Sequence, residues 1–196
     1  GGLISENECY SDYSSFGGGV YVSDGTFSMD GDAVVDSSND VYLKTGKTIT
    51  ISGKLTFNGY VATITPENYA ENVDAPVLAT DNGITLSEDV RKKFNVTKYN
   101  NNNNVETTIT ERGCLKNTLT LGENAELTED LYNICSTIIV TSADGMKAIS
   151  DLSQKKGDVD GKTFKGKTII LEKNVELDDK YKPIHKFSGV FDGKDH

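Results

Sequence analysis

The most regular feature of the sequence is a pattern of apolar and polar positions that recurs along the chain. Large aliphatic residues occupy its third and fifth places, and apolar residues return at its ninth and eleventh. Three copies align without a gap: KTITISGKLTF at 47–57, NTLTLGENAEL at 117–127 and KTIILEKNVEL at 167–177. Because the side chains of a strand alternate between its two faces, the pattern predicts a strand with one buried face, a polar turn and a second short strand.

Two weaker copies extend the pattern, GTFSMDGDAVV at 25–35 and NGITLSEDVRK at 82–92. The copies start at 25, 47, 82, 117 and 167, which gives steps of 22, 35, 35 and 50 residues. We interpret them as rungs that tolerate insertions at a turn. One rung cannot bury its inward face alone, whereas rungs stacked in parallel share a continuous core. The pattern therefore predicts an all-β fold, a right-handed parallel β-helix (β-solenoid).

An antiparallel sandwich is the alternative fold, because all half-buried strands show a similar alternation. An immunoglobulin-like sandwich acting as a linker between repeats is one form of it. The gap-free agreement of three copies favours stacking, and the irregular steps between copies favour the sandwich.

One short α-helix is predicted near residue 143. Apolar residues recur there at three-residue spacing, Ser142 can cap the start and Gly157 can end the helix. Its apolar positions are Ala143, Met146, Ile149 and Leu152. We expect it to cap exposed strand edges of the solenoid. The predicted domains are 1–140, β-solenoid rungs with insertions, and 141–196, the capping helix with the first strands of a following β-helix.

The charge of the chain excludes several classes of partner. The formal net charge is -10 and the pI about 4.7, so nucleic acid and anionic lipid surfaces are repelled. No run of apolar residues approaches the ~18 that a transmembrane helix needs, so no transmembrane segment is expected. The chain opens with Gly-Gly and no signal peptide, which indicates an internal piece of a longer protein.

The cysteines do not indicate a disulfide framework. There are three, Cys9, Cys114 and Cys135, so at least one is unpaired, and a bridge between Cys114 and Cys135 remains open. The two histidines, His185 and His196, are not near a cysteine at metal-ligand spacing. We expect no zinc site and no cofactor.

Two regions resemble known families of bacterial surface proteins. GGLISEN at 1–7 and GGGVYVSDGTFSMDGDAVV at 17–35 resemble the glycine-rich repeats of polymorphic outer-membrane and adhesin-type proteins. IIVTSADGMKAISDLSQKK at 138–156, GKTFKGKTIILEKNVEL at 161–177 and PIHKFSGVFDGKDH at 183–196 look like the opening of a β-helix with GLUG-type repeats. Both resemblances imply a right-handed β-helix repeat protein at the bacterial cell surface or secreted, acting as a stalk or adhesive surface.

A binding surface is expected on the outward side of the strands. Tyr21, Tyr42 and Tyr60 are predicted to point outward and could form a ladder that stacks on sugar rings, because their rings are flat and amphipathic. The alternative is that these tyrosines merely shield the strands. The expected partner is an extracellular glycan or a host surface protein.

Several aspartates form a second group of candidates. Asp158 and Asp160 in GDVDGK are the candidate metal ligands, since paired carboxylates can bind calcium. The alternative is that aspartates beside glycine form turns, and no EF-hand loop is present. Other aspartates of this kind are Asp24, Asp30, Asp32, Asp192 and Asp195.

Catalysis is not expected in this segment. The competing hypothesis is a fragment of a polysaccharide-active β-helix enzyme, a lyase or glycoside hydrolase. Such enzymes need carboxylates brought together on neighbouring rungs, or a basic group beside the substrate. Arg91 is the only arginine next to other cations, and we interpret it as part of a solvated insertion. No catalytic residue is assigned.

Overall fold

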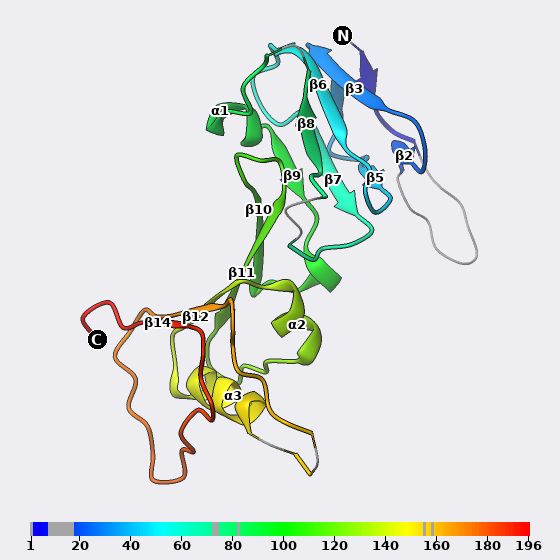
Figure 1. Ribbon diagram of the computed structural model, residues 1–196. Helices are drawn as coiled ribbons and strands as arrows, with labels where there is room; N and C mark the ends of the chain where they lie inside the picture. Colours follow the sequence, from blue (N-terminus) through cyan, green and yellow to red (C-terminus); the bar gives the residue numbers. More distant parts are fainter. Residues whose placement is uncertain (1, 8–17, 72–74, 82, 155, 158) are drawn as a thin grey trace. The chain divides into compact units, whose positions relative to one another are not determined.

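The chain folds into two compact units. The computed structural model describes residues 2–7, 18–71, 75–81, 83–154, 156–157 and 159–196 (Figure 1). Unit 1 comprises Gly1–Asn101 and Thr107–Lys116, and unit 2 comprises Asn102–Glu106 and Asn117–His196. The division runs through a hairpin near residue 112, whereas the sequence placed the boundary after Val140.

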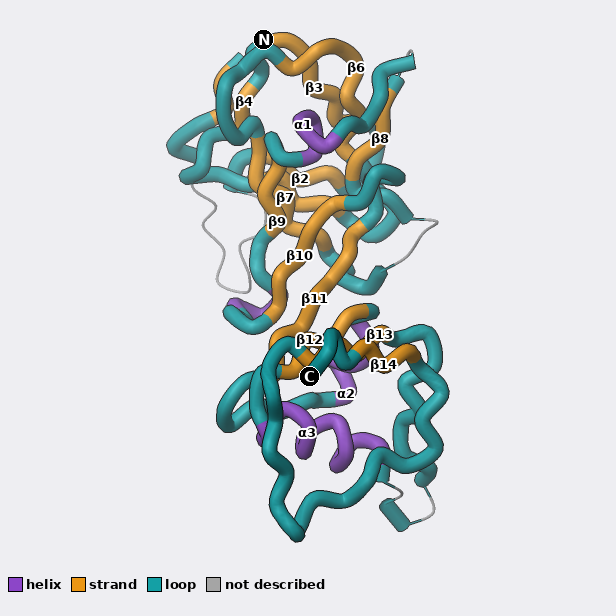
Figure 2. The backbone as a smooth tube through the Cα atoms, turned by 90° about the vertical axis from the view of Figure 1, so that its left-hand side faces the viewer, coloured by secondary structure: helices purple, strands orange, loops and turns teal. Residues whose placement is uncertain are grey.

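Unit 1 contains three sheets whose strand pairs are all parallel in the described residues. Figure 2 shows their strands in orange. A two-stranded sheet joins β1 (Leu3–Ile4) to β4 (Val34–Val35). A four-stranded sheet has the order β2 (Val20–Val22), β5 (Val41–Leu43), β7 (Ala62–Pro66) and β9 (Phe94–Val96). A three-stranded sheet has the order β3 (Phe27–Gly31), β6 (Ile49–Leu55) and β8 (Leu78–Thr80).

The register of β3 on β6 is the one that the repeated pattern predicts. Phe27 pairs with Ile49 and Met29 with Ile51, which are the third and fifth places of two copies. Met29, Ile49 and Ile51 are buried, so these inward positions are confirmed, whereas Phe57, at the eleventh place of its copy, is 40% exposed. They belong to one apolar core that extends through all three sheets, with Val41, Leu43, Ile64, Leu78 and Phe94 among its other members.

The prediction that residues 82–92 form a copy of the repeated strand pattern is wrong. The neighbour of β6 is β8, where Leu78 lies opposite Ile49, and residues 88–91 form the helix α1 (Glu88–Arg91). The Ser87 hydroxyl accepts a hydrogen bond from the backbone N–H of Val90, and two acidic residues follow in the first turn. Ser-Glu-Asp is a favourable helix start, and it prevails over a pattern that loses its last apolar place at Lys92.

The five-stranded sheet combines an antiparallel hairpin with a run of parallel strands. The sheet order is β10 (Val105–Ile109), β11 (Leu115–Leu121), β12 (Thr137–Val140), β13 (Thr168–Leu171) and β14 (Val190–Asp192). The backbone N–H of Thr110 donates to the carbonyl of Cys114, and that of Thr120 to Asn104, so β10 and β11 run antiparallel. The pairs from β11 to β14 are parallel, which makes this sheet mixed.

A column of buried aliphatic side chains crosses this sheet. Leu119 pairs with Ile138 and Ile138 with Ile169, and all three are buried. Leu119 and Ile169 hold the third place of their pattern copies, so their inward positions are confirmed. The intervening strand β12 does not belong to the pattern, and it separates the two copies by one strand.

The predicted helix is confirmed as α3 (Ala143–Ser153), which ends earlier than expected, before Gly157. The hydroxyl of Ser142 caps it by accepting from the backbone N–H of Gly145 at 3.1 Å. A shorter helix, α2 (Glu129–Ile134), is capped in the same way by Thr128. A single-turn 3-10 helix, η1 (Tyr99–Asn101), precedes β10.

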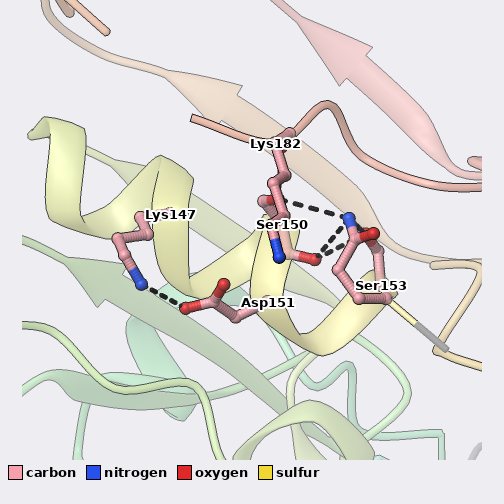
Figure 3. Close-up of polar contacts among 6 residues, drawn as sticks. Lys147, Ser150, Asp151, Ser153 and Lys182 are labelled. Atoms are coloured by element: carbon pink, nitrogen blue, oxygen red, sulfur yellow. Dashed lines mark hydrogen bonds and ion pairs between the residues drawn. The ribbon is translucent and has the colours of Figure 1, made fainter. Parts of the chain in front are cut away.

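Small polar residues attach α3 to the segment that leads to β14. The hydroxyl of Ser150 donates to the carbonyl of Lys182 (Figure 3). The hydroxyl of Ser153 accepts from the backbone N–H of His185 at 2.9 Å. Both serines are buried, so these bonds satisfy groups that water does not reach. On the exposed side of the helix, Lys147 pairs with Asp151 at 2.5 Å.

The prediction of a single right-handed parallel β-helix with one capping helix is wrong. In the described ranges the strands form four separate sheets, one of them mixed, with three α-helices among them. The fold is therefore a mixed α/β arrangement of several sheets. The pattern located buried positions, but capped helices and the turn at Gly113, whose φ is +78°, interrupt the succession of strands that it predicted.

Gly145 offers a test of how α3 packs. Replacing a helical glycine by alanine ordinarily stabilises a helix by about 1 kcal/mol. A Cβ at Gly145 would lie 2.4 Å from the carbonyl oxygen of Leu121, on β11. We therefore expect Gly145→Ala to lower the free energy of unfolding by ~1–3 kcal/mol, the usual cost of overpacking, in urea denaturation followed by circular dichroism.

The matched control is Lys147→Ala on the exposed side of α3. It removes only the surface ion pair with Asp151, so the free energy of unfolding should change by less than ~0.5 kcal/mol. A stabilised Gly145→Ala variant would show that α3 does not pack tightly on β11.

Candidate functional site

Two of the predicted outward tyrosines lie in contact. Tyr21 on β2 pairs in register with Tyr42 on β5, and their ring centroids are 5.3 Å apart. The neighbours Val41 and Leu43 belong to the core, so Tyr42 projects from the opposite face of the sheet. Tyr21 is 51% exposed and Tyr42 only 6% exposed. The outer ring is therefore supported by a buried one.

The aromatic surface continues past β7 toward β9. Tyr42 lies opposite Thr65, and Thr97, which follows β9, donates its N–H to the carbonyl of Ile64 at 2.9 Å. The hydroxyl of Tyr69 is hydrogen-bonded to that of Thr97, and the Tyr69 ring meets Tyr99 edge to face at 5.4 Å. We call Tyr21, Tyr42, Tyr69 and Tyr99 the tyrosine row.

Sequence reasoning missed Tyr69 and Tyr99. Neither lies in a strand: Tyr69 follows β7, and Tyr99 is in η1. They have no place in the two-residue alternation that singled out Tyr21 and Tyr42. Their membership of the row depends on the hydrogen bond to Thr97, which joins residues 28 positions apart.

Tyr60 was the third predicted member of the ladder. It lies in the loop between β6 and β7 and is 62% exposed. None of the ring contacts in the described part of the chain includes it. The structure thus joins Tyr21 to Tyr42 but not to Tyr60.

Carboxylates border the tyrosine row. Glu67 accepts hydrogen bonds from the backbone N–H of Thr45 at 2.9 Å and from its hydroxyl at 2.8 Å, and these bonds lower the pKa of Glu67. Asp40 accepts from the backbone N–H of Gly18 at 2.9 Å. An ionised Glu67 places negative charge beside neutral aromatic rings.

This environment raises the pKa values of two tyrosine hydroxyls in the row. Burial raises the pKa of Tyr42, and the charge of Glu67 raises it further. Burial also raises the pKa of Tyr69, against the lowering effect of its bond to Thr97, while Asp40 adds to the increase. Both phenols therefore remain protonated at neutral pH.

A small pocket adjoins the tyrosine row, since its lining includes Leu43, Pro66 and Asn68, the sequence neighbours of Tyr42, Glu67 and Tyr69. It has a volume of about 40 Å³. Pockets that enclose small molecules are about 300–1,000 Å³, so this one is too small for a sugar ring. The candidate site is the open surface of the tyrosine row.

The candidate acidic groups are engaged in turns and ion pairs where the structure describes them. Asp24 accepts from the backbone N–H of Gly25 at 2.8 Å and lies 3.1 Å from Lys47 Nζ, and Asp192 accepts from the N–H of Lys194. Asp160 lies 3.9 Å from Lys186 Nζ, while Asp158 is outside the described residues. Among those residues, no group of three or more histidines, cysteines or carboxylates could hold a metal. A calcium site at Asp158 and Asp160 stays a prediction.

One further expectation is corrected. Arg91 is not in a solvated insertion: it is half-buried, and its Nη1 donates to the carbonyl of Ile109 at 2.8 Å. Cys114 and Cys135 are both buried, and no disulfide joins them to each other. Cys9 lies outside the described residues.

No family model, curated protein or solved structure matches the chain. Across the described ranges, no helix has the length and apolar character needed to cross a membrane. The geometry of the tyrosine row is therefore the main guide to function.

The coupling between Glu67 and Tyr42 can be tested directly. Glu67→Gln keeps an oxygen that accepts from Thr45 but removes the negative charge, so the pKa of Tyr42 should fall toward its ordinary value. The measurement is a pH titration of the tyrosine ring carbons by NMR. Glu88→Gln, which removes a carboxylate paired with Lys92 on α1, is the control and should leave Tyr42 unchanged. An unaltered Tyr42 titration in Glu67→Gln would contradict the proximity.

Proposed function

We propose that this chain is a non-catalytic segment of a bacterial surface or secreted protein that serves as a stalk and adhesive surface, and that its tyrosine row binds uncharged carbohydrate. The observation that carries the proposal is the half-exposed ring of Tyr21 supported by the buried ring of Tyr42 at 5.3 Å. The resemblance of the glycine-rich and C-terminal segments to bacterial surface repeats supports the location.

A supported aromatic ring suits a sugar. The apolar face of a pyranose packs on a flat ring, and a tyrosine provides a large contact area with few torsions to restrict. Tyr42 packs against Tyr21 from the neighbouring strand, which lowers the conformational entropy that Tyr21 loses on binding. Glu67 and Asp40 supply acceptors for sugar hydroxyls at the border of the row.

The carboxylates at the border of the row restrict the class of glycan that we expect to bind. The charge of Glu67 acts on Tyr42 and that of Asp40 on Tyr69, and Lys44 offsets part of the charge at Glu67. A polymer of uronic acids or a sulfated glycan would meet repulsion there. A neutral glycan, or one with amino groups, would not.

The carboxylates that are clearly perturbed favour binding over catalysis. A general acid for sugar chemistry needs a raised pKa. Hydrogen bonds from Gly25 and Lys47 lower the pKa of Asp24, bonds from Ser38 lower that of Asp36, and Lys92 lowers that of Glu88. These groups act as turn formers or ion-pair partners, which supports an adhesive rather than a hydrolytic role.

The test is binding to a glycan array, followed by calorimetry with the best neutral oligosaccharide. Tyr21→Ala should weaken binding by about 3- to 10-fold, since a stacked aromatic pair contributes ~0.5–1.5 kcal/mol. Tyr21→Phe keeps the stacking face and should bind nearly as the unmodified chain does.

Tyr60→Ala is the matched control, because Tyr60 is similarly exposed but makes no ring contact with the described part of the row. Equal binding by Tyr21→Ala and the unmodified chain would refute the role of the row. Preferential binding of uronate polymers, or their cleavage, would favour the enzyme hypothesis instead.

A further inference from the structure

The small pocket beside the tyrosine row has the size of a sugar substituent. Its volume is about 40 Å³. It has room for about three groups of the size of a water molecule, since each of them needs ~10–15 Å³. A sugar ring does not fit into this space, whereas the methyl and carbonyl groups of an acetyl substituent do.

Part of the pocket lining is apolar. Leu43 and Pro66 contribute from the ends of β5 and β7, Val77 from the residue before β8, and Leu115 from the start of β11. These side chains are buried, and Ala70 adds a further methyl group. Such a lining favours an apolar group and offers a hydroxyl no hydrogen-bond partner.

Two hydrogen-bonding groups of opposite kind lie at the pocket. Asn68 lines it and accepts through Oδ1 from the backbone N–H of Ala70 at 2.9 Å, while its Nδ2 has no acceptor among the described residues. Glu67 accepts from Thr45 through Oε2, and its Oε1 has no donor within the described ranges. The site therefore offers one amide donor and one carboxylate acceptor.

The positive charges at the pocket are offset by carboxylates. Lys47 Nζ lies 3.1 Å from Asp24 Oδ1. The hydrogen bonds from Thr45 lower the pKa of Glu67, and the charge of Lys44 lowers it further, so Lys44 and Glu67 are close. Because each lysine has an acidic counterpart, the pocket favours a neutral group over an anion.

The pocket and the tyrosine row share a carboxylate. Glu67 is bonded to Thr45 of the pocket lining, and its charge adds to the effect of burial in raising the pKa of Tyr42. Tyr69 of the row lies between two lining residues in the sequence. An oligosaccharide that packs on the rings of the row can therefore place a ring substituent in the pocket.

We propose, resting on the proposed function of the row, that the pocket binds the acetamido group of an N-acetylhexosamine. The methyl group packs on the apolar lining, the carbonyl oxygen accepts from Asn68 Nδ2, and the amide N–H donates to Glu67 Oε1. A hydroxyl at the same place on the sugar has no methyl or carbonyl group and leaves the pocket to water. The row therefore selects N-acetylated neutral glycans.

The test compares chitotetraose, which consists of N-acetylglucosamine, with cellotetraose, which consists of glucose in the same linkage. The two differ only in carrying an acetamido group or a hydroxyl on each ring. In calorimetry we expect chitotetraose to bind at least about tenfold more tightly, because two hydrogen bonds and a buried methyl group contribute together. The deacetylated tetramer of glucosamine should bind more weakly than chitotetraose.

Variants at the pocket separate its contribution from that of the row. Asn68→Asp keeps the oxygen that accepts from Ala70 but replaces the amide donor, so the preference for chitotetraose should fall below about threefold. Ala70→Leu fills the pocket and should have the same effect. Asn58→Asp is the matched control, since it adds the same charge in the exposed loop before β7 and should keep the preference.

The outcomes distinguish this inference from the proposed function. Equal affinity for chitotetraose and cellotetraose, with both weakened by Tyr21→Ala, would overturn the assignment of the pocket and leave the row as a glycan site. A preference that survives both Asn68→Asp and Ala70→Leu would also overturn it, as would tighter binding of the glucosamine tetramer. Binding of none of these oligosaccharides would overturn the pocket and the row together.

Discussion

The structure depends on aliphatic side chains held in columns by parallel strand pairing. Ile49 pairs with Phe27 on one side and Leu78 on the other, and Ile138 lies between Leu119 and Ile169. Because side chains alternate at every residue, a slip of one position would turn a whole column toward water. Burying one large apolar side chain contributes ~1.5–3 kcal/mol, and a misaligned strand would lose this contribution for each column member. The register is therefore strongly specified.

The same register arranges the outer surface. Fixing Val41 and Leu43 in the core forces Tyr42 outward and places it beside Tyr21. In unit 2, Thr118, Thr137 and Thr168 form an equivalent outward column. The candidate binding surface is thus a consequence of core packing.

A strand at the edge of a sheet keeps unpaired backbone N–H and C=O groups on one side. Among the described residues, β14 is an edge strand of the five-stranded sheet. In unit 2 the helix α3 does not cover that edge: Gly145 packs against Leu121, and Ser150 and Ser153 attach the segment before β14.

The sequence by itself determined the inward third and fifth places of the repeated strands, the register of β3 on β6, the helix capped by Ser142, and the contact of Tyr21 with Tyr42. It did not determine the second half of each repeat, where Phe57 and Leu177 are 40% and 43% exposed. These follow from two- and three-residue periodicities and from capping, which are local properties. Only the tertiary structure decided the division into four sheets and two units, the strand β8 in place of the expected one, and the addition of Tyr69 and Tyr99 to the row. Those features depend on turns such as that at Gly113 and on contacts between distant residues, as when Tyr69 bonds to Thr97. A periodic pattern records the face that a side chain occupies, and it carries no information about the strand that will lie beside it.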